Sequence, residues 1–207
     1  EAMESPHAAG YKISLIDMAP QVMLPFDEDM AQLLHKEIID QGVELILGDG
    51  LKSIQAKDVT LSSGKKVPAQ AVIMAIGVRP ETALAKDAGL DLGETGSILV
   101  NRLMQTSDPD IFAVGDAIEV TSMMTGKKQR LALAGPALRQ ARVAAGVPYG
   151  QLGLIPQVLG ASVLRVFSLN AASVGLNERQ CQQEGLDYAV SFVLPMDRVG
   201  IMPHASP

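Results

Sequence analysis

Apolar and polar positions divide the first fifty residues into a strand, a helix and a second strand. A compact apolar run predicts a strand over Tyr11–Asp17 that ends on an acid. Beyond it, four apolar residues recur at helical spacing and predict an amphipathic helix from an N-cap at Asp27 to Gly42; they are Met30, Leu33, Leu34 and Ile38. The run VELILGDG, residues 43–50, is expected to form a second short strand.

The following pattern is richer in strands. Residues 59–77 predict two strands joined by a turn at Gly64, and the second of them, 71–76, is apolar at every position. Such a strand is expected to be buried on both faces, as in a parallel sheet. A short helix over 81–88 and a strand over 111–114 are expected next.

The last third contains one clear helix and a separate small unit. The stretch AGPALRQARVAA predicts a helix with Pro136 in its first turn. Residues 146–160 are rich in Gly and Pro and are typical of a linker. Two strand-like runs, 162–169 and 188–194, then flank a helix whose expected N-cap is Asn177, so this tail is interpreted as an α+β unit.

Composition narrows the class of protein. The 207 residues are 47% hydrophobic but only 3% aromatic, which predicts an aliphatic core. The net charge of −6 argues against a nucleic-acid-binding or anionic-membrane-binding surface. No apolar run reaches the ~20 residues of a membrane span, and no secretory leader is recognised. A single cysteine cannot form an internal disulfide, which favours a cytoplasmic location.

Asp17 is the first candidate for chemistry. In a dinucleotide-binding βαβ unit, a Gly-rich turn is followed by a helix and then by a strand whose terminal acid holds the adenosine ribose hydroxyls. The opening EAMESPHAAG has the length of that helix, so the glycine turn is expected to precede residue 1. Alternatively, Asp17 merely ends a strand and solvates a turn.

Two glycines follow predicted strands. Gly77 after VIMAI permits close approach of a ligand or of a neighbouring segment, although by itself the pattern favours a plain strand-to-helix turn. Gly115-Asp116 follows DIFAV, and ligands of open α/β sheets bind beyond the carboxyl ends of strands. Gly115 could therefore admit a ligand while Asp116 accepts hydrogen bonds from its hydroxyl groups.

The order of these motifs resembles the pyridine nucleotide-disulfide oxidoreductases, and within them the coenzyme A-disulfide reductase and NADH oxidase branch. The resemblance is carried by YKISLIDMAPQVMLPFDEDM, MAIGVRPETALAKDAGL, MQTSDPDIFAVGDAIEV, LALAGPALRQARVAA and GLNERQ. It implies an α/β fold with a Rossmann-like NAD-binding domain (1–77), the returning part of an FAD-binding domain (78–147) and the start of an α+β dimerisation domain (160–207). It also implies a homodimer that passes electrons from NADH through FAD to a small-molecule acceptor.

The resemblance also implies residue roles. Asp116 matches the aspartate that binds the ribityl or pyrophosphate part of FAD, and Asp17 matches the ribose acid of the NAD site. An acid there favours NADH over NADPH because it repels a 2′-phosphate. The helix that starts at Ala134, Gly135 and Pro136 matches the one whose N-terminus faces the flavin ring, where its partial positive charge stabilises reduced, anionic flavin.

Some features depart from the family pattern. The redox-active cysteine of the family belongs to an N-terminal segment that these residues lack, and Cys181 is interpreted as an incidental thiol, so no catalytic residue is assigned. Ile201-Met202 stand where a tyrosine pair is expected in coenzyme A-disulfide reductases, which argues against disulfide chemistry. His7, His35 and His204 do not have the spacing of a metal site, and His35 is expected at a solvated surface.

Two hypotheses of different class follow. The first is a part of an FAD- and NADH-dependent oxidoreductase that acts on a disulfide, similar to coenzyme A disulfide, or on oxygen, with the isolated chain inactive. The second is a non-catalytic module that keeps the fold for dimerisation or binding. Flavin binding distinguishes the two.

Overall fold

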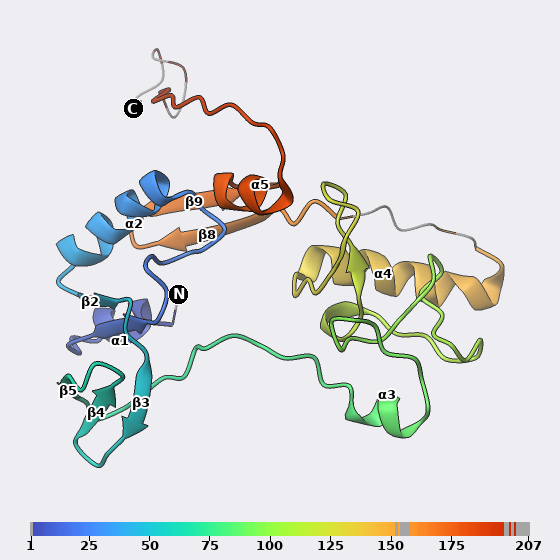
Figure 1. Cartoon of the computed structure of the whole chain (residues 1–207), viewed down its shortest axis with the longest axis horizontal. Helices are drawn as coiled ribbons and strands as arrows, with labels where there is room; N and C mark the ends of the chain where they lie inside the picture. The colour runs from blue at the N-terminus through green and yellow to red at the C-terminus, as the bar shows by residue number, and fades with distance from the viewer. Residues whose placement is uncertain (1, 152, 154–157, 197–198, 200, 202–207) are drawn as a thin grey trace. The chain divides into compact units, whose positions relative to one another are not determined.

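A computed structural model describes residues 2–151, 153, 158–196, 199 and 201 (Figure 1). The chain forms two compact units, Glu1–Leu176 and Asn177–Pro207. Within the described residues, no helix has both the length and the apolar character needed to cross a membrane.

The first unit opens with the βαβ arrangement that the sequence predicts. A short helix, α1 (Glu4–Ala8), precedes β1 (Ser14–Asp17), α2 (Glu28–Asp40) and β2 (Glu44–Leu47). The two strands pair in parallel, with Leu15 opposite Leu45 and Ile16 opposite Ile46. Parallel neighbours need a crossover connection, and α2 supplies it. The expected α/β fold is thereby confirmed.

Helix α2 is amphipathic, but its buried stripe differs from the predicted one. The buried side chains are Ala31, Leu34, His35 and Ile38, one face of a helix. Met30 and Leu33 are 40% and 49% exposed, so two of the four apolar residues that predicted the helix lie outside its core face. The helical spacing of apolar residues located the helix correctly. It did not identify the buried face, because more than one set of residues on the helix has that spacing.

Three short strands follow β2 and cover one side of the parallel pair. They are β3 (Leu51–Ile54), β4 (Asp58–Leu61) and β5 (Lys66–Pro68), and they form an antiparallel sheet in the order β3-β4-β5. Gly64 makes the β4–β5 turn at a φ of 90°, as its position in the sequence predicts. The buried side chains of this sheet, Val59, Leu61 and Val67, pack against Ile16 and Ile46.

The strand predicted over 71–76 is wrong. These residues form an exposed segment without regular structure between β5 and α3 (Figure 1), and Ile73 and Ile76 are 63% and 83% exposed. No strand of the described chain pairs with them. An all-apolar run specifies the environment that a segment requires, whereas a strand also needs neighbours that supply hydrogen bonds on both edges.

The middle of the chain is mostly irregular around one core. The helix expected over 81–88 is observed as α3 (Ala83–Asp87). The strand predicted over 111–114 is wrong, because Phe112 makes only an isolated bridge to Gln105 before the 3₁₀ turn η1 (Gly115–Ala117). A cluster of Ala85, Ile98, Met104 and Ile118 forms the core here.

Two short strands and a long helix complete this part. The strands β6 (Val120–Thr121) and β7 (Lys128–Gln129) pair antiparallel, and α4 (Ala134–Gly146) follows, with a 3₁₀ turn, η2 (Val147–Tyr149), at its end. The helix predicted from AGPALRQARVAA is thus confirmed.

A β-hairpin closes the first unit. Its strands, β8 (Ser162–Val166) and β9 (Leu169–Ser173), lie within and beyond the single strand predicted over 162–169. Val166 and Ala171 belong to the same core cluster as Leu34 and Ile38 of α2. The prediction missed the turn because its residues, Phe167 and Ser168, include neither a glycine nor a proline to mark it.

The second unit consists of α5 (Glu178–Glu184) and an extended segment. Asn177 is the N-cap, as predicted, and forms a capping box with Gln180. The strand predicted over 188–194 is wrong: these residues are exposed and unpaired in the described chain. Met202 and His204 lie outside the described residues.

Candidate cofactor site

The Gly115-Asp116 turn begins where an extended segment ends. Val114 has extended dihedral angles, and Gly115 turns the backbone with a φ of 80°, a conformation that favours glycine. The Gly115 N–H donates a hydrogen bond to Oε1 of Gln140 in α4, with an N···O distance of 2.7 Å. Asp116 follows on the surface, where its carboxylate is accessible to a ligand.

The N-terminus of α4 lies beside this turn. A Cβ atom placed on Gly115 would be 3.9 Å from the Cβ atom of Ala137, in the first turns of the helix. Ala134 and Gly135 are exposed and Pro136 is half-buried. The first amide groups of a helix have no partner within the helix, and the helix dipole adds partial positive charge there. The structure therefore brings together five of the predicted site residues, namely Gly115, Asp116, Ala134, Gly135 and Pro136.

Asp17 occupies the carboxyl end of β1, as expected for a nucleotide-binding acid. Its Oδ1 accepts the N–H of Ala19 at 2.9 Å, and its backbone oxygen accepts the N–H of Asp49 at 3.3 Å. Within the described part of the chain, Oδ2 accepts no hydrogen bond. A carboxylate has about four acceptor positions, so Asp17 keeps capacity for the two hydroxyl groups of a ribose.

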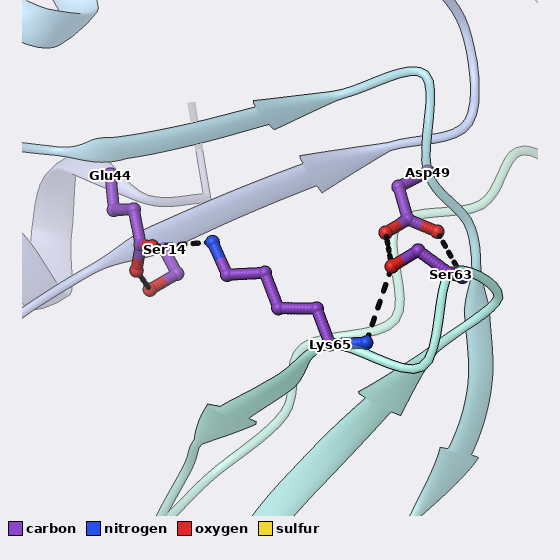
Figure 2. A network of polar contacts seen from close by, with 5 residues as sticks. All are labelled: Ser14, Glu44, Asp49, Ser63 and Lys65. Carbon is purple, nitrogen blue, oxygen red and sulfur yellow. Dashed lines mark hydrogen bonds and ion pairs between the residues drawn. The ribbon is translucent and has the colours of Figure 1, made fainter.

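A polar network joins β1, the strand that ends at Asp17, to β2 and to the turn between β4 and β5 (Figure 2). Ser14 and Lys65 donate to Glu44 at 2.8 and 3.1 Å, which links β1 and β2 to the turn before β5. Both contacts lower the pKa of Glu44, and the hydrogen bond from Ser14 has the largest effect. Ser63 donates from both its hydroxyl and its N–H to Asp49 and lowers the pKa of that carboxyl. The loop after β2 is thereby fixed to the turn between β4 and β5.

Gly77 lies apart from any close contact. It has a φ of 93°, but a Cβ atom placed on it would meet nothing within 4 Å. The close approach that its sequence position indicates is therefore not made by any described segment. Cys181 is a half-buried free thiol in α5. Among the described residues, no group of three or more His, Cys, Asp or Glu side chains could hold a metal ion.

Sequence reasoning missed Gln140 and misplaced His35. A glutamine within a helix gives no signal of burial, yet Gln140 is 2% exposed. His35 was expected at a solvated surface but is 8% exposed. Its Nε2 accepts the N–H of Val22 at 3.1 Å, so Nδ1 carries the proton and donates to Gln32 at 3.2 Å. His35 thus anchors the loop that follows Asp17.

His35 makes stability depend on pH. Burial lowers its pKa below 6.5, so the folded state favours the neutral ring. The stabilisation by neutral His35 is complete above about pH 6.5, the ordinary pKa of histidine. It is lost as the pH falls from there through the lowered pKa of the folded state. Protonation also removes the acceptor of Val22, so we expect a loss of about 1 kcal/mol. Urea unfolding at pH 7.5 and 5.5 measures it, and His35→Gln should lack this part of the loss. An identical pH profile in the variant would refute this role.

The comparisons with known proteins show the family of the chain. A family model described as pyridine nucleotide-disulphide oxidoreductase matches residues 1–141. The chain belongs to that family. Its members are FAD- and NAD(P)H-dependent flavoprotein oxidoreductases.

Individual relatives locate the chain within the family. It is 37% identical to an NADH oxidase of Methanocaldococcus jannaschii over 171 aligned residues. These residues make up 81% of the chain and 38% of that protein. It is 30% identical to the CoA-dependent NAD(P)H sulfur oxidoreductase of Pyrococcus furiosus, over all of the chain and 47% of that protein. The crystal structure of reduced CoADR-RHD from Bacillus anthracis matches with a TM-score of 0.94 and 40% sequence identity. The match covers 98% of the present chain and 37% of the CoADR-RHD chain. The chain thus spans less than half of each of these proteins.

Proposed function

We propose that this chain supplies the second FAD-binding segment and the ribose acid of the NAD site in a flavoprotein oxidoreductase. Such an enzyme would move hydride from NADH through FAD to a disulfide, similar to coenzyme A disulfide, or to oxygen. The observation that carries the proposal is the packing of the Gly115-Asp116 turn beside the N-terminus of α4. In this proposal, residues 1–77 belong to the NAD-binding domain, 78–147 to the FAD-binding domain and 160–207 to the dimerisation domain.

The proposed FAD contacts follow from charge and accessibility. Asp116 is exposed and would accept hydrogen bonds from hydroxyl groups of the ribityl chain, or lie near the pyrophosphate. The amides at the start of α4 would face the flavin ring, where the helix dipole favours added negative charge. Bound FAD would accept hydride and pass electrons on, while these residues bind and orient it.

Asp17 supports a preference for NADH. Its unused carboxylate oxygen could accept hydrogen bonds from both ribose hydroxyl groups of the adenosine. A 2′-phosphate would bring negative charge against the same carboxylate, and like charges at short range repel. The NADPH complex should therefore be weaker.

The proposed electron acceptor is supported by the relatives and not by a site among the described residues. The printed names of two relatives, an NADH oxidase and a CoA-dependent sulfur oxidoreductase, support oxygen or a sulfur compound as the acceptor. Neither Cys181 nor any other described residue is assigned a catalytic role. Ile201-Met202 replace the expected tyrosine pair, which favours oxygen over a disulfide acceptor in this proposal.

Nuclear magnetic resonance titrations of the ¹⁵N-labelled chain test the proposal. Millimolar FAD should shift the amide signals of Gly115, Asp116 and residues 134–137, and NADH should shift those near Asp17 at lower concentration than NADPH. Asp116→Ala should weaken FAD binding, and Asp17→Ala should weaken NADH binding, each about tenfold or more, because a hydrogen bond to a charged group contributes roughly 1.5–3 kcal/mol. NADPH binding should change less with Asp17→Ala.

Asp110→Ala is the matched control, because Asp110 is an exposed aspartate six residues before Asp116. It should leave both titrations unchanged. Shifts scattered over the surface, or equal sensitivity to both aspartates, would contradict the FAD assignment. Equal NADH and NADPH affinity would contradict the role of Asp17. If FAD shifts no signal while the chain dimerises, the non-catalytic module is the better explanation.

We also propose that the chain forms a homodimer through its tail. The segment 188–194 exposes its large apolar side chains, among them Val190, Phe192 and Leu194 at 59%, 56% and 74% exposure. A unit of this size buries too little surface to be stable alone. Analytical ultracentrifugation at tens of micromolar, on the order of concentrations where weak association is visible, should show a dimer. Phe192→Asp should shift it to monomer, and a monomeric parent chain would rule the proposal out.

A further inference from the structure

Gln140 is the most deeply buried polar side chain of α4. It is 2% exposed and belongs to the few large side chains that are fully buried. Its neighbour Arg139 is exposed, so the helix turns this one amide towards the interior. A primary amide placed away from water is destabilising unless it makes hydrogen bonds. Its burial therefore requires a structural or functional partner.

That partner is the turn which carries the proposed flavin-binding acid. Oε1 of Gln140 accepts the N–H of Gly115 at 2.7 Å. Gly115 is the point where the backbone changes from the extended Val114 to a φ of 80°. Asp116 is the next residue, so the direction of its Cα–Cβ bond depends on the orientation of the peptide that Gln140 holds.

We propose that Gln140 is a positioning residue for flavin binding, which sets Asp116 relative to the N-terminus of α4. This inference rests on the proposed function. Gln140 lies six residues after Ala134, or ~9 Å along a helix axis. The Gln140 side chain therefore joins the two elements that would contact FAD, the turn that carries Asp116 and the helix α4. It fixes the distance between Asp116 and the N-terminus of that helix. Backbone hydrogen bonds hold the far end of the turn, with the N–H of Ile118 donating to Gly115 and that of Ile98 to Ala117. The bond from Gln140 holds its start.

Two substitutions separate the hydrogen bond from the packing. Gln140→Met keeps the length and volume of the side chain but removes the acceptor, whereas Gln140→Glu keeps an oxygen at the same position. Amide hydrogen exchange of the ¹⁵N-labelled chain reads the contact directly. The Gly115 amide should exchange about tenfold faster in Gln140→Met, the effect of losing one hydrogen bond, and Gln140→Glu should restore slow exchange.

The flavin titration then tests the positioning role. FAD should shift the Asp116 signal in the parent chain and in Gln140→Glu, whereas Gln140→Met should require about tenfold more FAD for the same shift. The amides of α2 should exchange at parental rates in all variants, which shows that the fold is retained. Arg139→Met, an exposed change on the same helix, should alter neither measurement.

Each outcome bears on a separate statement. Unchanged Gly115 exchange in Gln140→Met overturns the inference, as does faster exchange with unchanged FAD binding. If FAD shifts no signal even in the parent chain, the proposed function fails; the exchange rates then show only that Gln140 holds the turn, and the positioning role for flavin falls with it. Failure of Gln140→Glu to restore either property would assign the effect to packing instead of the hydrogen bond.

Discussion

The purified 207-residue chain, mixed with excess FAD and desalted, is expected to emerge without flavin. The sequence contains no G-x-G-x-x-G turn, the backbone element that holds a dinucleotide pyrophosphate. Asp116 and the start of α4 provide only part of such a site. Hydrogen bonds to a charged group contribute roughly 1.5–3 kcal/mol each. The absence of two or three such hydrogen bonds should weaken FAD binding by several powers of ten, because about 1.4 kcal/mol corresponds to a tenfold change in affinity.

The absorbance of the desalted protein in the flavin band measures this directly. The same chain should still show the weak, localised FAD contacts in the titration described above, which separates weak binding from none. NADH should bleach no flavin, and oxidoreductase activity should be absent. Stoichiometric flavin that survives desalting and is bleached by NADH would show that this chain forms a complete site.

Replacing Ile38 by alanine is expected to lower the free energy of unfolding by about 2–5 kcal/mol, as for other large-to-small changes in cores. Ile38 is 2% exposed and lies in the cluster that joins α2 to Val166 and Ala171 of the β8–β9 hairpin. The cavity would therefore open between elements that are far apart in the sequence. Domains are stable by only about 5–15 kcal/mol, so a large share of the total is lost.

Ile39 provides a matched control on the same helix. It is 57% exposed, so Ile39→Ala removes the same atoms from a position that contributes little burial. Its stability should remain within about 0.5 kcal/mol of the parent chain. Urea unfolding curves with equal slopes for the three proteins would give the comparison. Equal losses at both positions would contradict the packing of α2 against the hairpin.

Local signals in the sequence were sufficient where the structure depends on neighbours along the chain. The parallel βαβ unit, the Gly64 turn, helix α4 and the N-cap at Asn177 were all predictable. Each depends on periodicity, on backbone preference or on a side chain that bonds within a few residues. The resemblance of the motifs added the family, which the comparisons confirm.

Strands at 71–76, 111–114 and 188–194 could not be established in this way. All three segments have strand-like composition, yet the described chain leaves them without a ladder of hydrogen bonds. A strand is completed by partners that are remote in sequence or belong to another segment, so composition alone predicts a tendency to pair.

The sequence by itself determined the order of the elements, the acids at Asp17 and Asp116, and the family to which they point. Only the tertiary structure decided that Gln140 and His35 are buried and that each accepts a backbone N–H from a loop, 25 and 13 residues away along the chain. The physical reason is that burial of a polar side chain depends on what packs over it. Polar residues on a helix look the same in sequence whether water or a distant backbone amide satisfies them.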